Sequence, residues 1–305
     1  MDAGLILWYG ISKNLKLHSK KTVKEALFYE PLSDHKVKCN LCPHACKILP
    51  GKCGFCRVRE NQKGKLYSLI YSQITSLALD PIEKKPLYHF HPGEYILSVG
   101  TKGCNLSCPF CQNWSISQKS DVPLKEISPG EIIRKAKQYK SFGIAYTYNE
   151  PFVWYEFVLD TAILARKEGL KNVLVTNGYI NPRPLDKIIP FIDAMNIDLK
   201  SMENEFYRKF CQGNLENVLA TIKRASGACH VELTNLVIPG LNDKDENFIM
   251  LVDWVLNFLG PKIPMHFSRY FPCYRMDLPP TPPATLKRAE AIARKKLKYV
   301  YLGNL

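Results

Sequence analysis

The chain of 305 residues is 46% hydrophobic and 23% charged, a composition that excludes wholesale disorder and supplies enough apolar residues for a substantial core. Its 42 lysine and arginine residues outnumber its 28 aspartate and glutamate residues, which gives a formal net charge of +14. Because the basic residues are scattered and not interleaved with aromatic residues in one patch, we expect a solvated basic surface, with nucleic-acid binding as the minority alternative.

The usage of the 11 cysteines indicates metal binding in a reducing compartment. Eight of them are crowded into two clusters, at residues 39–56 and 104–111, mostly with gaps of two and three residues. Such spacing favours metal ligands over disulfides. The apolar run at residues 5–11 is too short to span a bilayer and follows the acidic Asp2, so we expect no signal peptide, no membrane segment and a cytoplasmic location.

The first third of the chain divides into three predicted segments. Residues 1–35 carry a weak helical pattern and are predicted to form an N-terminal helical extension. Residues 36–60 hold five cysteines with little apolar periodicity, which indicates a small cysteine-rich metal-binding lobe. Residues 61–94 combine one alternating stretch with a proline-rich segment, and we expect them to be a connector on the surface of the next unit.

From residue 95 to residue 305, short apolar runs alternate with amphipathic helices. Strands are predicted near residues 95–100, 144–148, 172–176, 194–198, 231–238, 264–268 and 298–302. The first intervening helix opens with Ser128, Pro129 and Glu131, a capping box with proline at the first helical position. Six such units predict an α/β fold with a parallel sheet. An incomplete (β/α)6-type TIM barrel is the first choice and an open doubly wound sheet the second.

Cys104, Cys108 and Cys111 form a C-x3-C-x2-C loop directly after the first of these strands, where barrel active sites lie. A cubane iron–sulfur cluster usually takes four thiolates, so three leave one iron open to another ligand. The alternative is that a fourth cysteine completes a zinc or electron-transfer site. With Phe110 before the third cysteine, the pattern C-x3-C-x-aromatic-C resembles the signature of the radical S-adenosylmethionine (SAM) superfamily.

This resemblance implies a 4Fe-4S cluster, bound SAM and the chemistry of that superfamily. The amino and carboxylate groups of SAM would chelate the open iron, and one electron from a flavodoxin- or ferredoxin-type donor would cleave a C–S bond of SAM. Methionine and a 5′-deoxyadenosyl radical would result, and the radical would remove a hydrogen atom from a substrate. The three cysteines are therefore the predicted catalytic residues, while the rest of the protein positions the substrate carbon.

Polar residues stand at the ends of the later predicted strands, where ligands bind in parallel α/β folds. Asn149 and Glu150 lie where radical SAM enzymes have a glycine-glycine-glutamate segment that holds the SAM amino group, and the two glycines are absent here. VTNG (175–178) and DLK (198–200) resemble segments of glycyl-radical-enzyme activating enzymes, whose lysine meets the SAM carboxylate. The resemblance places Phe110, Asn149, Glu150, Thr176, Asn177, Asp198, Lys200 and His266 around SAM.

A closer resemblance covers roughly residues 22–304. CNLCPHAC (39–46), DPIEKKPLYHF (80–90), GTKGCNLSCPFCQNW (100–114) and YTYNEP (146–151) look like the AmmeMemoRadiSam-system radical SAM proteins. That family is similar to pyruvate formate-lyase activating enzyme, which implies a protein glycine as the hydrogen donor, and it accompanies Memo-like and AMMECR-like proteins. Relatives continue past the strand at residues 299–304 with another cysteine pair, so we expect the family's C-terminal tail to be missing from this chain.

The second cysteine cluster offers five thiols where a tetrahedral zinc or a fully ligated cubane needs four. Spacing alone prefers the two C-x2-C pairs, Cys39 with Cys42 and Cys53 with Cys56. The family pattern instead implies Cys39, Cys42, Cys46 and Cys56, with Cys53 as an extra thiol. The metal is zinc or an auxiliary iron–sulfur cluster, and the sequence leaves both open.

Two other functions fit the same residues. The positive charge and a zinc ribbon would suit an enzyme that modifies RNA by the same radical chemistry. A fully ligated cluster would instead suit an iron–sulfur electron carrier without catalytic activity. The three isolated cysteines Cys211, Cys229 and Cys273 are expected to be buried apolar residues, and Cys273 is the only one of them that we would test for chemistry.

Overall fold

An eight-stranded sheet forms the centre of the fold. In the computed structural model, which describes residues 23–305, its strands lie in the order β16-β15-β14-β13-β12-β11-β9-β8. Strands β9 and β11 to β16 are parallel, and β8 pairs antiparallel with β9 at one edge. They are β8 (Ser76–Pro81), β9 (Tyr95–Gly100), β11 (Gly143–Tyr146), β12 (Lys171–Thr176), β13 (Ala194–Asp198), β14 (His230–Val237), β15 (Met265–Arg269) and β16 (Val300–Gly303).

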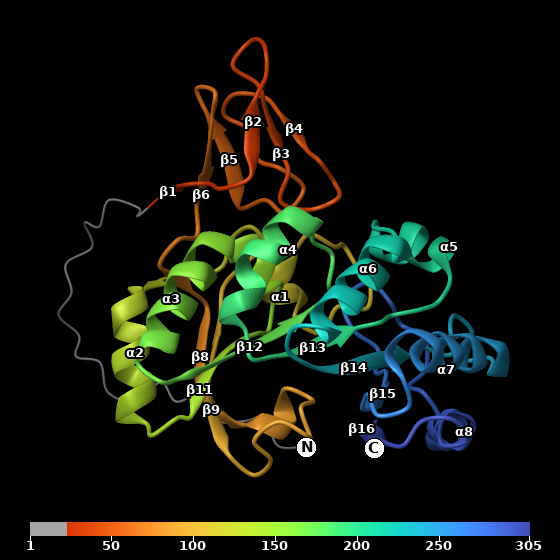
Figure 1. Ribbon diagram of the computed structural model, residues 1–305. Coiled ribbons are helices and arrows are strands. Elements are labelled where there is room, and N and C mark those ends of the chain that lie inside the picture. Colours follow the sequence, from red (N-terminus) through yellow and green to blue (C-terminus); the bar gives the residue numbers. More distant parts are fainter. Residues whose placement is uncertain (1–22) are drawn as a thin grey trace.

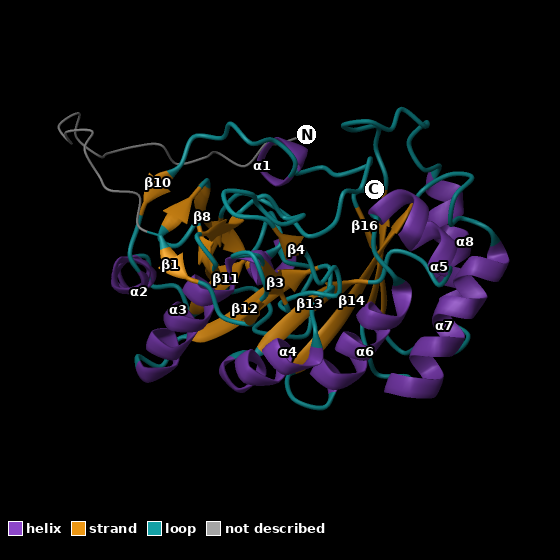
Figure 2. Ribbon diagram, turned by 90° about the horizontal axis from the view of Figure 1, so that it is seen from above, coloured by secondary structure: helices purple, strands orange, loops and turns teal. Residues whose placement is uncertain are grey.

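The parallel strands follow one another in chain order without reversal. Figure 2 shows the consequence, because helices α2, α3, α4, α6, α7 and α8 form an arc along one side of the strands. A doubly wound sheet reverses its order and carries helices on both faces. The prediction of an incomplete barrel is therefore confirmed and the doubly wound alternative is wrong, while β8 and β16 remain the two unjoined edges of the sheet.

Local sequence explains where the helices begin. At the start of α2 the Glu131 carboxylate accepts the Ser128 N–H at 2.7 Å, and the Ser128 hydroxyl accepts the Glu131 N–H, which is the predicted capping box. No helix within residues 23–305 is long and apolar enough to cross a membrane. The helices are α1 (Trp114–Ser117), α2 (Pro129–Gln138), α3 (Tyr155–Lys167), α4 (Pro182–Ile188), α5 (Asn204–Phe206), α6 (Leu215–Ser226), α7 (Asp245–Leu259) and α8 (Pro283–Ala293). Short helical turns are η1 (Ile82–Lys84), η2 (Pro151–Trp154), η3 (Ile189–Phe191) and the π-helical η4 (Tyr207–Cys211).

The N-terminal lobe consists of short antiparallel strands in two small sheets, and it stands on one end of the partial barrel (Figure 1). One sheet joins β1 (Lys24–Glu25), β6 (Lys65–Ser68) and β5 (Arg59–Gln62), and the other joins β2 (Tyr29–Pro31), β3 (Val37–Cys39) and β4 (Lys47–Ile48). Nearby, β7 (Gln73–Ile74) pairs with β10 (Lys125–Glu126).

The predicted helical extension at residues 1–35 is wrong for its last part. Residues 23–35 contain β1 and β2, whereas residues 1–22 lie outside the described part of the chain. The reason is long-range pairing, since Lys24 lies opposite Ser68 and Tyr29 opposite Cys39. Such pairing decides the conformation of a two- or three-residue strand, whose own sequence is too short to show a period.

Residues 61–94 are not a surface connector. Strand β8 joins the main sheet, and the segment after it packs part of its side chains on the face of the sheet opposite the helices, while Lys84, His89 and residues 92–94 are exposed. There Ile82 and Leu87 are fully buried against Ile96 and Ala145, while Leu97, the neighbour of Ile96, packs in the core on the helix side. The proline residues that suggested a surface loop suit this place too, because proline brings no N–H that burial would leave unsatisfied. The apolar side chains of the segment thus cover this face of β9, β11, β12 and β13.

Candidate functional site

The three predicted cluster cysteines lie on the loop that follows β9, at the carboxyl edge of the sheet. Cys108 is buried, and Cys104 and Cys111 are partly buried. The Cys104 sulfur accepts the Leu106 N–H at 3.3 Å, and the Cys111 thiol lies 3.8 Å from the Ser117 hydroxyl. The loop thus presents three thiols, and a backbone N–H group or a hydroxyl group contacts two of them, Cys104 and Cys111.

Their surroundings disfavour free thiolates. Burial raises the pKa of Cys104 well above its ordinary value and raises that of Cys111, while a hydrogen bond with the Cys211 thiol and burial raise that of Cys108. Thiolates here therefore need a positively charged partner, which iron or another soft metal supplies. Within residues 23–305 no three cysteine, histidine or acidic side chains stand where they share one metal ion.

Asn149, at the end of β11, holds the start of this loop. Its Oδ1 accepts the Thr101 N–H at 3.1 Å and its Nδ2 donates to the Gly103 carbonyl at 2.9 Å. Gly103 itself has φ 91°, and a Cβ there would lie 2.7 Å from Val58 of the lobe, so only glycine allows this close approach. The preceding Tyr148 adopts φ 74°, the left-handed backbone that glycine favours. Asn149 therefore shapes the cysteine loop.

Glu150 connects the ends of β11 and β12. Its buried carboxylate accepts the Thr176 hydroxyl at 2.7 Å and the Asn177 N–H at 2.8 Å, and burial raises its pKa to about 7. The Asn177 side chain then donates to the Cys104 sulfur at 3.6 Å and to the Asn105 side chain at 2.9 Å. Three residues predicted from strand ends, Glu150, Thr176 and Asn177, are thus joined to the cysteine loop by one hydrogen-bond chain.

Asp198 and Lys200 follow β13 on the same edge of the sheet. The Lys200 ammonium lies 2.8 Å from the Asp198 carboxylate, and their side chains are 13% and 36% exposed. Burial lowers the pKa of Lys200, but Asp198 and the neighbouring Cys108 and Cys211 raise it by a larger amount. The pKa of Lys200 therefore lies well above its ordinary value. The site therefore keeps a fixed positive charge beside the second cysteine.

The remaining two predicted residues take up other positions. His266, on β15, lies 2.6 Å from the Glu232 carboxylate and makes an edge contact with Tyr88, with ring centres 4.8 Å apart. These contacts place it in the barrel interior and not against the cysteine loop. Phe110 is buried on Phe206 of α5, with ring centres 5.9 Å apart, so it fixes the loop by packing.

Three residues near the triad were not predicted from the sequence as site residues. The Asn105 side chain accepts from Asn177 and donates to the Tyr179 carbonyl at 2.6 Å. The Cys211 thiol is fully buried beside Cys108, and the Cys273 thiol donates to the Cys111 carbonyl at 3.5 Å. Asn105 could have been found from its place between two cluster cysteines, but no local signal marks Cys211.

Four of the five cysteines of the lobe lie together, and the fifth lies apart from them. Four thiols line a single cavity, and Cys53 is exposed, with its backbone paired to that of Glu60. The four are Cys39, Cys42, Cys46 and Cys56. Asn105 of the barrel also lines this cavity.

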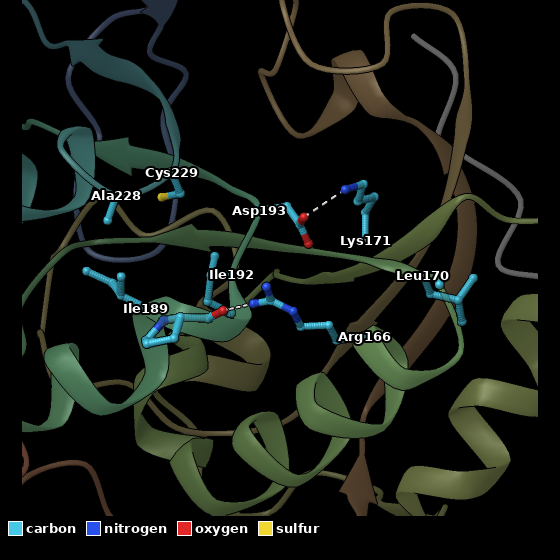
Figure 3. Close-up of a pocket in the computed structure, with 10 residues that line it drawn as sticks. Arg166, Leu170, Lys171, Ile189, Ile192, Asp193, Ala228 and Cys229 are labelled. Carbon is cyan, nitrogen blue, oxygen red and sulfur yellow. Dashed lines mark hydrogen bonds and ion pairs between the residues drawn. The ribbon is translucent and has the colours of Figure 1, made fainter.

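A cavity of about 580 Å³ lies at the opposite end of the sheet (Figure 3). Lys171 opens β12, and Asp193 and Cys229 precede β13 and β14. The Lys171 ammonium is bound to Asp193 at 3.0 Å, and Arg166 donates to the Pro190 carbonyl. Since these polar groups satisfy one another at the amino ends of the strands, this cavity lies apart from the cysteine loop and presents no free catalytic group of its own.

Comparison with known proteins identifies the class. The sequence profile of the radical SAM superfamily matches residues 98–252, which is half of the chain and includes the cysteine loop. The chain belongs to the radical SAM superfamily. Membership implies a 4Fe-4S cluster and SAM, and the three thiols with their soft sulfur donors fit that cluster.

Three sequence relatives show which members of the superfamily this chain is similar to. An uncharacterized protein of Methanocaldococcus jannaschii is 48% identical over 93% of this chain and 86% of its own length. The (2S)-3-sulfopropanediol dehydratase activating enzyme of Klebsiella oxytoca is 30% identical over 44% of this chain and 43% of its own length. The pyruvate formate-lyase 1-activating enzyme of Escherichia coli K12 is 25% identical over 48% of this chain and 62% of its own length. The chain is thus homologous to activating enzymes and matches less than two thirds of each.

Solved structures support the fold. A radical SAM methyltransferase from Sphaerobacter thermophilus superposes with a TM-score of 0.53 at 19% identity, over 70% of this chain and 67% of that one. SuiB of Streptococcus suis gives 0.53 at 13% identity, over 68% of this chain and 48% of that one. At such identities the likeness concerns the fold alone.

Proposed function

We propose that Cys104, Cys108 and Cys111 hold a 4Fe-4S cluster whose open iron binds SAM, and that the protein abstracts a hydrogen atom from a substrate. When bound, the cluster and SAM supply reductive cleavage of a C–S bond and hence a 5′-deoxyadenosyl radical. The observation that carries the proposal is that the cysteine loop lies against the ends of β11, β12 and β13. There the Asn177 side chain donates to the Cys104 sulfur at 3.6 Å.

The other predicted site residues are assigned roles that follow from their contacts. Lys200, positively charged and held by Asp198, suits the SAM carboxylate. The polar atoms of Asn149, Glu150 and Thr176 form hydrogen bonds with the backbone and with one another. We therefore assign these residues to positioning the loop. His266 and Phe110 are assigned to the interior lining and to packing of the loop.

The reaction class that we propose is activation of a partner protein by hydrogen abstraction from a glycine. Its support is the homology with two activating enzymes and the VTNG and DLK segments at the matching strand ends. An electron donor of flavodoxin or ferredoxin type would then be a partner. We further propose membership of the AmmeMemoRadiSam group, with Memo-like and AMMECR-like proteins as functional partners. We also propose a cytoplasmic location, because all 11 cysteines are free thiols.

Production of 5′-deoxyadenosine tests the proposal. Anaerobically reconstituted and reduced protein is incubated with SAM, and the nucleoside is quantified by chromatography. We expect the product from wild type, none from Cys104→Ala, and unchanged amounts from the matched control Cys229→Ala, whose thiol lies at the other end of the sheet. Equal yields from wild type and Cys104→Ala would refute the proposal.

The Cys211 thiol beside Cys108 gives the electron-carrier alternative a specific form, in which Cys211 is a fourth ligand. An open iron predicts that SAM shifts the EPR signal of the reduced cluster in wild type. A signal that SAM shifts only in Cys211→Ala would instead establish a fully ligated cluster.

A further inference from the structure

Two segments that are far apart in the sequence meet at the cysteine loop. The Arg275 N–H donates to the Pro109 carbonyl at 2.9 Å, and the Tyr274 ring stacks on the Trp114 ring, with centres 5.4 Å apart and 13° between the planes. Trp114 opens α1, and its N–H donates to the Cys111 carbonyl. Figure 2 shows α1 outside the arc of the outer helices. A partly exposed pair of stacked rings therefore lies next to a predicted cluster ligand.

A tight turn after β15 holds the Tyr274 ring in this position. Cys273 and Met276 exchange two backbone hydrogen bonds, at 3.0 and 3.2 Å, and the Tyr270 hydroxyl donates to the Met276 carbonyl at 2.9 Å. Between them Tyr274 adopts φ 61°, a left-handed backbone that is uncommon for a bulky residue. Such a conformation persists only where surrounding contacts fix it, so the two rings are stacked before any partner binds.

Basic side chains extend the stack at both ends. The Lys119 ammonium lies 4.5 Å from the centre of the Trp114 ring, and the Arg275 guanidinium lies 4.9 Å from the centre of the Tyr274 ring. Both basic residues are exposed. A cation over the face of an aromatic ring is attracted by the ring quadrupole. We call this row of Lys119, Trp114, Tyr274 and Arg275 the aromatic ladder.

Two further basic residues lie next to the aromatic ladder. Arg57 of the lobe donates to the Ser117 carbonyl at 2.6 Å, and Lys102 donates to the Ser120 carbonyl at 3.1 Å. Both carbonyls belong to the short segment at residues 114–120, which also carries one ring and one cation of the ladder. Four basic residues thus converge on a piece of chain that begins three residues after a predicted cluster cysteine.

The positive charge of these four residues is not neutralised within the chain. Among residues 23–305 no carboxylate forms an ion pair with any of them, and this includes the exposed Asp121 and Asp277 of the neighbouring segments. Arg224 of α6, in contrast, is paired with Asp186 of α4. The charge around the ladder is therefore available to carboxylates of another molecule.

We propose that the aromatic ladder, together with Arg57 and Lys102, is the docking surface for a small acidic protein that delivers one electron to the cluster of the cysteine loop. The inference rests on the proposed function, because it takes that cluster as the electron acceptor. The prosthetic group of the donor loses one electron, the cluster gains it, and no bond forms or breaks in this step.

The composition of the surface suits such a partner. Encounters between electron-transfer proteins bury small areas, in which aromatic and arginine residues supply affinity and charges at the rim steer the approach. The aromatic ladder offers both beside Cys111, where the distance to the acceptor is short. RNA is a poorer fit, since a nucleobase stacks on a free ring face and each ring here is already contacted by the other ring and by a cation.

Direct binding tests the surface without any radical chemistry. An acidic flavodoxin and an acidic ferredoxin, both oxidised, are titrated separately onto anaerobically prepared protein at several salt concentrations. We expect at least one of them to bind wild type with an affinity that falls as salt rises. The double variant Lys119→Glu with Arg275→Glu is expected to bind about tenfold more weakly. Failure of both carriers to bind wild type would overturn the proposal.

A second double variant controls for net charge. Lys140 and Lys262 are exposed in the turns before β11 and β15, at the opposite end of the sheet. Lys140→Glu with Lys262→Glu therefore changes the net charge by the same amount as the ladder variant and leaves the ladder intact. We expect this control to bind the carrier as wild type does. Equal losses of affinity in the two double variants would mean unspecific attraction and would sink the proposal.

Reduction kinetics separate docking from the cluster itself. Bleaching of the cluster absorbance is followed after mixing with the reduced carrier or with dithionite, a small reductant that needs no docking surface. We expect Lys119→Glu with Arg275→Glu to slow reduction by the carrier about tenfold and to leave reduction by dithionite unchanged. Equal slowing with both reductants would place the defect in the cluster site and contradict the docking role. Because neither readout uses SAM, normal docking and reduction without 5′-deoxyadenosine would refute the proposed function alone.

Nucleic acid has its own arm in the experiment. A tRNA mixture replaces the carrier in the same titrations, and we expect the ladder variant and the control variant to bind it equally. Binding of tRNA that only the ladder variant loses, with no binding of either carrier, would assign the surface to RNA instead.

Discussion

The carboxylate of Glu232 is a single buried group that several donors hold in its ionised form. Its Oε1 accepts the His89 N–H at 2.7 Å and lies 3.0 Å from His230, and its Oε2 lies 2.6 Å from His266. Burial by itself raises the pKa, but hydrogen bonds from His230, His266 and two backbone N–H groups lower it to about 2. The position of His266 therefore depends on a carboxylate that stays charged.

The pKa of Glu232 predicts a pH-dependent stability. Because it lies below the ordinary value of 4.5, the stabilisation is fully present above pH 4.5 and is lost as pH falls toward 2. A depression of this size corresponds to on the order of 3 kcal/mol. We expect Glu232→Gln to be destabilised by this order at pH 7, with the difference from wild type shrinking at pH 3. Urea unfolding at both pH values measures it.

Exposed Glu246 provides the control, since Glu246→Gln is expected to change the free energy of unfolding by less than about 0.5 kcal/mol at either pH. A deficit of Glu232→Gln that is equally large at pH 3 and pH 7 would contradict the assignment of the charge.

Asn149 marks the limit of residue-level prediction. The strand ends and the cysteine spacing correctly gathered Asn149, Asn177 and Lys200 at one edge of the sheet. The sequence could not tell which of these amides faces a ligand, because an amide satisfies a backbone N–H as readily as a bound molecule. Only the contacts of Asn149 with Thr101 and Gly103 assign it to the loop.

Among the elements, β8 is joined to the segment after it by a buried ion pair, with a second and more exposed pair between Asp80 and Lys84. Asp80, at the end of β8, binds the Lys85 ammonium and the Tyr148 hydroxyl, both at 2.8 Å. The Lys85 side chain is 3% exposed and also lies over the Tyr148 ring at 4.8 Å. The pair thus ties the edge strand to the end of β11.

Removal of Asp80 alone should be costly because it leaves a buried ammonium without its carboxylate. We expect Asp80→Asn to lower the free energy of unfolding by about 3–5 kcal/mol. The double variant Asp80→Asn with Lys85→Met removes both charges and is expected to recover most of that loss. Denaturant unfolding of the three proteins measures the difference, and a double variant less stable than Asp80→Asn would disprove the explanation.

The parallel strands were predictable and β8 was not, for a physical reason. Strands such as β9 and β12 are buried on both faces and therefore appear as continuous apolar runs. All six residues of β8 are only partly buried, so they show no apolar run. Its pairing with β9 depends on tertiary contacts that its own sequence does not reveal. The same holds for β1 and β2, whose partners decide their conformation.

At the scale of the whole molecule, the lobe is fastened to the barrel by a buried ion pair. Arg59 of β5 and Glu156 of α3 lie 3.0 Å apart, and each side chain is 1% exposed. Glu156 also accepts the Leu27 N–H of the lobe at 2.8 Å. A second pair crosses the same boundary at the surface, between Lys24 of β1 and Asp160 of α3.

The two pairs predict unequal consequences for otherwise similar substitutions on α3. Glu156→Gln leaves the Arg59 charge buried and unpaired, so we expect a loss of about 3–5 kcal/mol and faster amide exchange throughout β1 and β5, with α7 and α8 unchanged. Asp160→Asn breaks a pair whose side chains are 41% and 34% exposed, and is expected to cost about 1 kcal/mol or less. Hydrogen exchange with mass spectrometry and urea unfolding distinguish them. Similar losses in both variants would mean that apolar packing, and not the buried pair, holds the lobe on the barrel.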